Sequence, residues 1–303
     1  MSEGIAARVV VVGDGALADE VVRNLSLAGI PSAVHRPADF WTTLRLSDLQ
    51  DCYCAVAAGC DPRSLRRLNS LVQVAGVDFV SVSLGPDGIV LESFPYGSDA
   101  ECACFECAGP PAPTDVVAAM PDPIATGIAG ALAAAAALQC SGHGARCLSI
   151  PALVASGTST ALQRRDGCPA CAPPWRGPRV IRTRNRWTAR AGLTPGTATL
   201  DDQTVRLSDP IVLGCECPHC GPIEVLAGAI NRPVSELPDQ APACPGCGAG
   251  PLRIEVGDEF SLGELVARFG GGPVPAKFAL ACIGGNAVCF DLEPAAAPEP
   301  GAD

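Results

Sequence analysis

Four C-x-x-C pairs constrain the fold of this chain more than any other feature of its sequence. Each pair places two thiolates on one tight turn, and two pairs together supply the four ligands of a structural zinc site. Proline follows the first cysteine in three of the pairs. The alternatives are disulfides or buried free thiols. We predict two zinc sites, the second a compact ribbon, formed by Cys104, Cys107, Cys168 and Cys171 and by Cys217, Cys220, Cys244 and Cys247.

The redox environment decides between metal and disulfides. The stretch from Met1 to Arg8 has no basic segment followed by an apolar core and a cleavage site, as a secretory signal would. We therefore expect a reducing cytoplasm, where C-x-x-C pairs favour metal. Segment 124–140 comes closest to a membrane span, but it is rich in alanine and glycine and slightly shorter than the roughly 20 residues required. We expect a buried, tightly packed helix there and no membrane partner.

Composition limits the partners further. The chain has 303 residues, enough for two domains, and a formal net charge of −11. Such acidity argues against nucleic acid, whose binding needs an excess of basic charge. Lys277 is the only lysine in the sequence, which matters because phosphate chemistry often uses one.

A glycine turn begins the first half of the chain. Residues 8–13 form a β-branched run typical of a buried parallel strand, and the segment from Gly13 to Ala18 then fits G-x-G-x-x-[GA]. A helix over 16–28 follows. This strand–turn–helix order favours a nucleotide-binding turn, although the turn can also be a connection without a ligand. The next strand, 32–35, lacks the terminal acidic residue that a nicotinamide oxidoreductase would use, so that function is our third hypothesis.

The remaining pattern predicts an α/β fold, a Rossmann-like domain with a mostly parallel sheet. Asp87-Gly88 is the expected hairpin turn. The elements expected around it are strands at 51–58, 80–84, 89–94 and 147–154 and a helix at 63–75, with an irregular crossing loop at 108–123.

The second half has a different composition. Six arginines lie between Arg176 and Arg190, either as a solvated linker or as a docking face for an acidic peptide. Strands at 197–213 precede the ribbon, and a small α+β unit follows it, with strands at 252–256, 278–282 and 287–292 and a helix at 262–269. We expect the domains to be 1–172, closed by the first zinc site; 173–210, linker and strands; 211–293, ribbon plus α+β unit; and a disordered tail, 294–303.

The order of these signals resembles the E1-like family, which includes the adenylating enzymes of thiamin and molybdopterin biosynthesis. The resemblance covers about residues 8–172 and lies in the glycine loop, the Asp-containing turn, and the two cysteine pairs separated by a helix. It implies MgATP as a cofactor, with Gly13 and Gly15 along the phosphates and Asp61 on the metal. It also implies dimerisation.

Parts of the family's nucleotide site are missing. We find no D-x-D strand end, no Ser-Asn-Leu-x-Arg-Gln helix and no phosphate-contacting lysine. Leu68-Asn69 and the run from Gly76 to Val80 are similar to the partner subunits of azoline-forming cyclodehydratases. That resemblance implies a subunit without ATP chemistry, which holds a peptide for a separate catalytic protein. The winged-helix leader-binding module of many such subunits is not found before residue 8.

We therefore expect a zinc-binding scaffold or binding subunit for a peptide or small carrier protein, in a peptide- or sulfur-modifying system. The alternative is an active adenylyltransferase that activates the C-terminal carboxylate of such a substrate and uses arginine where the family uses lysine. In that case a nucleophilic thiol could come from outside the four pairs: Cys52, Cys54, Cys60, Cys102, Cys140, Cys147, Cys215, Cys282 or Cys289.

Overall fold

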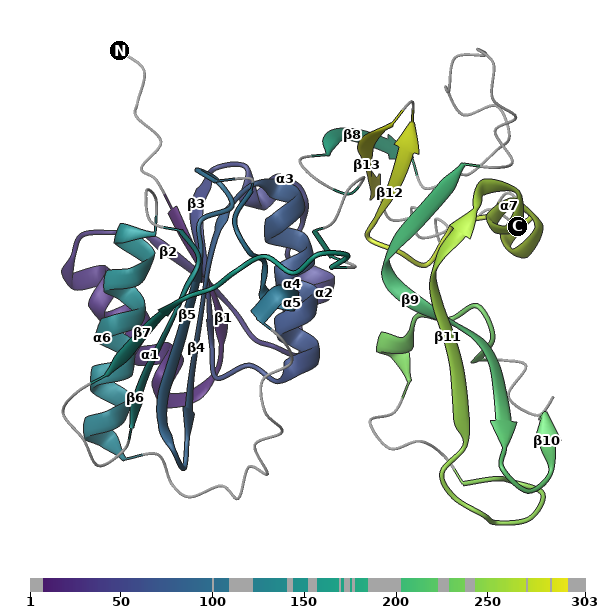
Figure 1. Ribbon diagram of the computed structural model, residues 1–303, viewed down its shortest axis with the longest axis horizontal. Coiled ribbons are helices and arrows are strands. Elements are labelled where there is room, and N and C mark those ends of the chain that lie inside the picture. Colours follow the sequence, from purple (N-terminus) through teal and green to yellow (C-terminus); the bar gives the residue numbers. More distant parts are fainter. Residues whose placement is uncertain are drawn as a thin grey trace, which may run out of the picture. The chain divides into compact units, whose positions relative to one another are not determined.

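The computed structural model divides the chain into two compact units, Met1–Gly177 and Pro178–Asp303 (Figure 1). The loop expected at 108–123, the strands expected before 203 and the expected tail lie largely or wholly outside the residues that the structure describes. Those residues are 8–99, 101–108, 122–140, 144–151, 157–168, 170–171, 175, 178–184, 203–222, 229–237, 243–270, 272–283 and 285–293.

The first unit contains a seven-stranded sheet in the order β2-β1-β3-β4-β5-β6-β7 (Figure 1). The first four of these strands pair in parallel, and β5, β6 and β7 add antiparallel. The central strands are continuous apolar runs because both faces are covered. Their bounds are β1 Arg8–Gly13, β2 Ser32–His35, β3 Cys52–Ala58, β4 Asp78–Gly85, β5 Gly88–Phe94, β6 Arg146–Pro151 and β7 Thr158–Ala161.

Two helices, one of them rich in alanine, cover one face of this sheet. Helix α1 (Gly15–Leu27) packs against α6 (Pro123–Gln139), and both contribute to the main core cluster. The close approach depends on Gly130, where an added Cβ would lie 2.5 Å from the Cβ of Glu20 and 3.0 Å from its carbonyl carbon. The tight packing predicted for the alanine- and glycine-rich segment 124–140 is confirmed at this contact.

On the opposite face lie α4 (Pro62–Ala75) and the short helices α2 (Phe40–Thr43), α3 (Leu46–Leu49) and α5 (Phe105–Ala108). Helix α4 starts at Asp61, whose side chain accepts hydrogen bonds from the backbone N–H groups of Arg63 and Ser64. It ends at Gly76, which adopts the left-handed conformation with φ 66°. The sequence predicted α4 but none of the three short helices, which are too short to show a hydrophobic period.

One prediction about the strands of this unit needs correction. The β4–β5 hairpin turns at Pro86-Asp87, because Gly85 and Gly88 already pair across it, so the prediction of an Asp87-Gly88 turn was one residue late. The strand expected at 147–154 is present as β6 as far as Pro151, and its last three expected residues lie outside the described part of the chain. No prediction covered β7, a short polar strand that follows β6.

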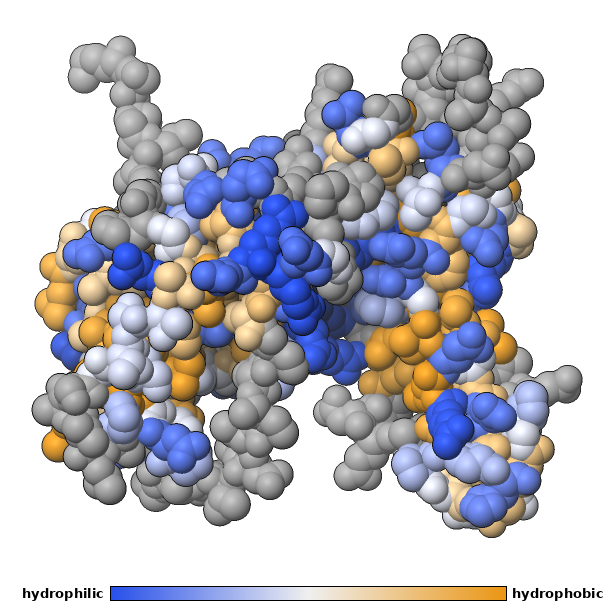
Figure 2. Space-filling view, viewed as in Figure 1, coloured by the Kyte–Doolittle hydropathy of each residue, from blue (hydrophilic) through white to orange (hydrophobic). Residues whose placement is uncertain are grey.

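The predicted buried helix at 124–140 also needs correction. One side of α6 is buried, but the other is open to solvent and carries no charged residue. Hydrophobic surface gathers at the left margin of Figure 2, where α1 and α6 lie in Figure 1. Besides Pro123 and Gln139 at its two ends, the exposed residues of α6 are spaced by four, three, four and three: Ile124, Ile128, Ala131, Ala135 and Leu138. We call this row the α6 seam.

None of the described helices combines the length and the hydropathy that crossing a membrane requires.

The second unit contains a six-stranded sheet in the order β10-β9-β12-β13-β8, with β11 paired to β9. Helix α7 (Leu262–Phe269) begins with a capping box between Ser261 and Glu264, and Leu265 is fully buried in the core of this unit. The predicted helix at 262–269 matches α7. The strands are β8 Arg179–Arg184, β9 Thr204–Cys217, β10 Gly221–Pro222, β11 Arg253–Ser261, β12 Phe278–Ile283 and β13 Asn286–Glu293.

Candidate metal centres and the glycine turn

The first four-cysteine group draws together two segments 64 residues apart in the sequence. Cys104 and Cys107 lie at α5, and Cys168 and Cys171 follow β7. The sulfur atoms of Cys104 and Cys107 are 3.7 Å apart, those of Cys104 and Cys168 are 3.6 Å apart, and those of Cys107 and Cys171 are 3.4 Å apart. Four sulfurs around one zinc ion would be about 3.8 Å from one another, and a disulfide would be about 2.05 Å long. The group can hold a metal ion, as predicted.

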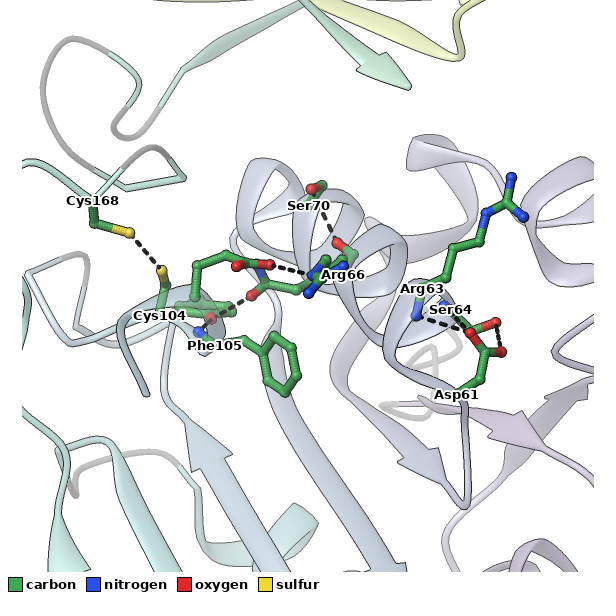
Figure 3. Close-up of polar contacts among 11 residues, drawn as sticks. Asp61, Arg63, Ser64, Arg66, Ser70, Cys104, Phe105 and Cys168 are labelled. Atoms are coloured by element: carbon green, nitrogen blue, oxygen red, sulfur yellow. Dashed lines mark hydrogen bonds and ion pairs between the residues drawn. The ribbon is translucent and has the colours of Figure 1, made fainter. Parts of the chain in front are cut away.

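Backbone and side-chain contacts position these sulfurs. The amide of Arg165 donates to the Cys107 sulfur over 3.4 Å, and the Arg164 guanidinium donates to the carbonyl of Cys171 over 2.6 Å. Figure 3 shows Cys104 and Cys168 facing each other beside Phe105. The amide of Phe105 donates to the hydroxyl of the buried Tyr96, which in turn donates to Asn69 on α4. The site is therefore tied to the helical layer.

Two thiols of this group, Cys104 and Cys171, differ in acidity. A hydrogen bond from Cys104 makes the largest contribution and lowers the pKa of Cys171 to about 6, although burial opposes it. The same interaction, with burial, raises the pKa of Cys104. A cation would favour the thiolate form of all four, because a coordinating thiol is deprotonated.

The second group lies at one end of the β9–β11 ladder. Cys217 ends β9, Cys220 follows it in the next turn, and Cys244 and Cys247 lie in the turn before β11. The sulfurs of Cys217 and Cys247 are 3.7 Å apart, and those of Cys244 and Cys220 are 4.0 Å apart. This group can also hold a metal ion. It is more open than the first, since Cys220 and Cys247 are exposed.

The histidine inside this turn takes no part as a ligand. His219 donates its backbone N–H to the Cys217 sulfur over 3.4 Å, and its ring is outside the four-sulfur group. That agrees with its interpretation as a loop residue. All 17 cysteines lie in the described part of the chain, and none forms a disulfide.

The glycine turn lies at the point where the sheet reverses its order. From β1 the chain passes to β2 on one side, and β3 lies on the other, so the carboxyl ends of β1 and β3 border the crevice where open α/β sheets bind ligands. We call this region the switch point. A Cβ on Gly13 would lie 2.6 Å from the carbonyl oxygen of Ala58 and 3.0 Å from the Cβ of Ala18, so Gly13 serves close packing. Gly15 has φ +67° and open space around it.

Asp61 also lies at the switch point, but its oxygens serve the helix. Oδ1 accepts from the amides of Arg63 and Ser64, and Oδ2 accepts from the Ser64 hydroxyl over 2.5 Å (Figure 3). Partial burial alone would raise the pKa of Asp61, but the hydrogen bonds from Ser64 and Arg63 outweigh it and lower the pKa. The structure therefore accounts for Asp61 as the N-cap of α4.

The charge at the switch point is negative. Burial, together with the carboxylates of Asp61 and Asp14, raises the pKa of Cys60 to about 12. The Cys60 thiol donates to the carbonyl of Val12 over 3.2 Å. Lys277, the single lysine, belongs to the other unit. Two acidic side chains therefore border the place where phosphates would bind.

The cysteines outside the two groups are shielded from solvent. None of them is exposed, and burial raises the pKa of Cys54, Cys140 and Cys289. Cys102 and Cys215 remain outside the four-sulfur groups, although they adjoin them in sequence. The adenylyltransferase alternative would need an accessible thiol, and no described cysteine outside the two groups is exposed enough to supply it.

Sequence reasoning missed the contacts that surround the first metal centre. Tyr96 carries no motif, and Asn69 entered only through the resemblance to cyclodehydratase partner subunits; the fold brings the two together. Trp41 is partly buried and lies under the Arg67 guanidinium at 4.8 Å. His35 lies 3.2 Å from the Thr43 hydroxyl.

Comparisons with known proteins place the chain among distant structural neighbours. No family model matches it, and no curated protein matches it. The heterocyclase TruD aligns at 15% identity and a TM-score of 0.37, over 56% of this chain and 28% of that one. E. coli MccB with ATP aligns at 13% identity and a TM-score of 0.39, over 55% and 67%. The chain thus spans little more than a quarter of the heterocyclase and about two thirds of MccB.

Proposed function

We propose that this chain is a zinc-binding E1-like protein with a degenerate ATP site, which acts as a scaffold or binding subunit for a peptide or small carrier protein. Its partner is a separate catalytic enzyme of a peptide- or sulfur-modifying, natural-product pathway in the cytoplasm. One observation carries the proposal. Both four-cysteine groups are complete, whereas the switch point presents Asp14 and Asp61 and has no lysine.

Zinc is the metal that this donor set favours. Four thiolates in tetrahedral arrangement suit zinc or an iron–sulfur cluster, and a closed four-ligand site is typical of structural zinc. Inductively coupled plasma mass spectrometry on protein purified without chelators tests this directly. We expect zinc at two equivalents per chain, one for each group, and iron with acid-labile sulfide would contradict the assignment.

The two carboxylates at the switch point argue against nucleotide turnover. Phosphoryl-type charge has to be met by positioned cations, and two carboxylates at the same place repel it. Arg63 and Arg67 lie on α4 nearby, but Arg67 is stacked on Trp41. Isothermal titration with MgATP tests the proposal: no heat of binding is expected, and micromolar affinity would contradict it.

The alternative is an active adenylyltransferase in which Asp61 binds magnesium and Gly13 and Gly15 approach the phosphates. The open space around Gly15 favours this alternative, because a backbone with φ +67° and no neighbour leaves room for a ligand. ATP–pyrophosphate exchange that depends on a peptide carboxylate would establish it. If no peptide encoded beside the gene supports ATP–pyrophosphate exchange, the adenylyltransferase alternative is excluded.

We further propose that the α6 seam forms the contact between two copies of the chain. Its spacing of four and three residues is that of a coiled-coil interface, and its alanines permit close approach. A helix without charged residues offers the same uncharged row to a twofold-related copy. Leu27, which is 75% exposed at the end of the neighbouring α1, extends the apolar surface.

A further inference from the structure

Among the described residues, the last strand of the first sheet leaves one side of its backbone unpaired. β7 pairs with β6 through four residues, Thr158 to Ala161, and no described strand follows it (Figure 1). Every residue of β7 is exposed. In an antiparallel edge strand, alternate N–H and C=O groups point outward and can pair with another chain.

The side chains of β7 do nothing to prevent such pairing. Natural edge strands are commonly protected by charges, prolines or bulges. The run from Thr158 to Ala161 has no charge and no proline, and its register with β6 is regular. Pale side chains, neither strongly polar nor apolar, occupy the part of Figure 2 where β6 and β7 lie in Figure 1.

The opposite edge of the same sheet is built differently. Strand β2 lies between Pro31 and Pro37, which have no N–H to offer, and three of its four residues are only partly exposed. Val34 is its one exposed position. The two edges of one sheet therefore differ, and only β7 is open over its whole length.

Basic side chains stand at one end of β7. Arg146 is the register partner of Ala161 on β6, and Arg165 follows β7 by four residues. Both side chains are exposed, and neither has an ion-pair partner among the described residues. In a protein of net charge −11, two uncompensated arginines beside an open edge favour an acidic ligand there.

The first metal centre holds this edge in place. The amide of Leu162 donates to the carbonyl of Ala145 over 2.8 Å, directly after β7. Three residues later the amide of Arg165 reaches the sulfur of Cys107. The strand is thus anchored by β6 on one side and by the four-cysteine group at its C-terminal end. An edge fixed in this way requires little ordering when a second strand binds.

We propose that β7 is a docking edge for an extended peptide segment, which adds antiparallel as an eighth strand with its acidic N-terminal residues beside Arg146 and Arg165. This proposal deepens the proposed function, on which it rests for the peptide nature of the partner. A second copy of the chain is the weaker occupant. The four residues of β7 span only about 13 Å. Pairing along so short an edge would not bury the roughly 1,200–2,000 Å² of a stable interface between two copies.

A designed peptide tests the proposal. The probe is an acetylated heptapeptide of alternating valine and threonine with two glutamates at its N-terminal end, added to the full-length zinc-loaded protein. We expect saturable binding by fluorescence anisotropy and slower hydrogen exchange in the fragment that contains 158–161. Binding that is not saturable, or protection confined to 32–35, would overturn the proposal.

Matched variants separate the docking edge from the general scaffold role. Thr160→Glu, at an exposed position of β7, should weaken binding about fivefold, because it places a like charge beside the peptide. Val34→Glu, on the opposite edge, should leave the affinity unchanged. The double change Arg146→Gln with Arg165→Gln should abolish the preference for glutamates over glutamines in the probe. Equal affinity in Thr160→Glu and the wild type would refute the proposed docking edge. The scaffold proposal would be unaffected, because the MgATP titration tests it separately.

Discussion

Tyr96 donates a hydrogen bond to the Oδ1 of Asn69 over 2.6 Å, and this bond joins the segment of the first metal centre to helix α4. The same hydroxyl accepts the backbone N–H of Phe105 over 3.0 Å. Burial, followed by the nearby Cys104, raises the pKa of Tyr96 well above its usual value, so the phenol stays neutral and keeps its proton for Asn69. Phe94 stacks on the Tyr96 ring, and Phe79 and Phe105 pack against Phe94 in turn.

Tyr96→Phe should destabilise the first unit by about 1–3 kcal/mol, because it leaves two buried polar groups without a partner. Urea denaturation measures the loss. Tyr53→Phe is the matched control, since the Tyr53 hydroxyl is buried and has no hydrogen-bond partner. Removing it should be neutral or slightly stabilising. Equal losses in the two variants would show that the Tyr96 bond contributes nothing specific.

Two glycines of α6 should respond to alanine in opposite directions. At Gly130 an added Cβ meets Glu20 on α1 at 2.5 Å, so Gly130→Ala forces the helices apart and should cost about 1–3 kcal/mol. At Gly127 nothing lies within 4 Å, and Gly127→Ala should stabilise the helix by up to about 1 kcal/mol. Thermal unfolding followed by circular dichroism shows whether each variant gains or loses stability. A loss of stability in Gly127→Ala would contradict the contact geometry.

The sequence predicted the parts of this fold that depend on local pattern. The β-branched run at 8–13, the capped helix that became α4 and the two cysteine groups all follow from spacing or from residue type. The strand that became β7 was missed because it is four polar residues long and has no alternation. The α6 seam was missed because an alanine-rich helix has almost the same hydropathy on every side.

The candidate site likewise has features that the sequence predicts and features that only the fold shows. Spacing alone paired the eight cysteines correctly, since C-x-x-C geometry is local. The role of Asp61 could not be read from sequence, because an aspartate before a helix can serve either as its N-cap or as a metal ligand. Only the hydrogen bonds from Arg63 and Ser64 separate these roles.

The N-cap makes stability depend on pH in a defined direction. The folded-state pKa of Asp61 is lowered, so its ionised form stabilises the fold above the unfolded value of about 4, and this stabilisation is lost as pH falls through the folded pKa. Asp61→Ala should cost about 0.5–2 kcal/mol at pH 7. The difference in the free energy of unfolding between wild type and variant should narrow below about pH 4. A difference that stays constant from pH 7 to pH 3 would show that the Asp61 carboxylate is not the cause.

Removing one ligand from each four-cysteine group should act on each unit separately. Cys168→Ser should lower the zinc content from two equivalents to one and unfold mainly the first unit, whereas Cys247→Ser should lose the other ion and affect mainly the second. Metal analysis with limited proteolysis reads both effects. Cys147→Ser is the control, because Cys147 is half-buried and belongs to neither group. Full zinc retention in both ligand variants would refute the assignment.

A charge in the α6 seam should separate the proposed pair of subunits without harming the fold. Ala131→Glu places a carboxylate at an exposed position in the middle of the seam, where a twofold-related copy would bring its own, so both repulsion and desolvation oppose the contact. Sedimentation equilibrium should show a dimer for the wild type and a monomer for the variant, with unchanged thermal stability at low protein concentration. Glu20 on α1 faces Gly130 and not the seam, so Glu20→Gln serves as a control that keeps the dimer. If the wild type is monomeric at micromolar concentration, the seam has another partner, and the proposal of a homodimer fails.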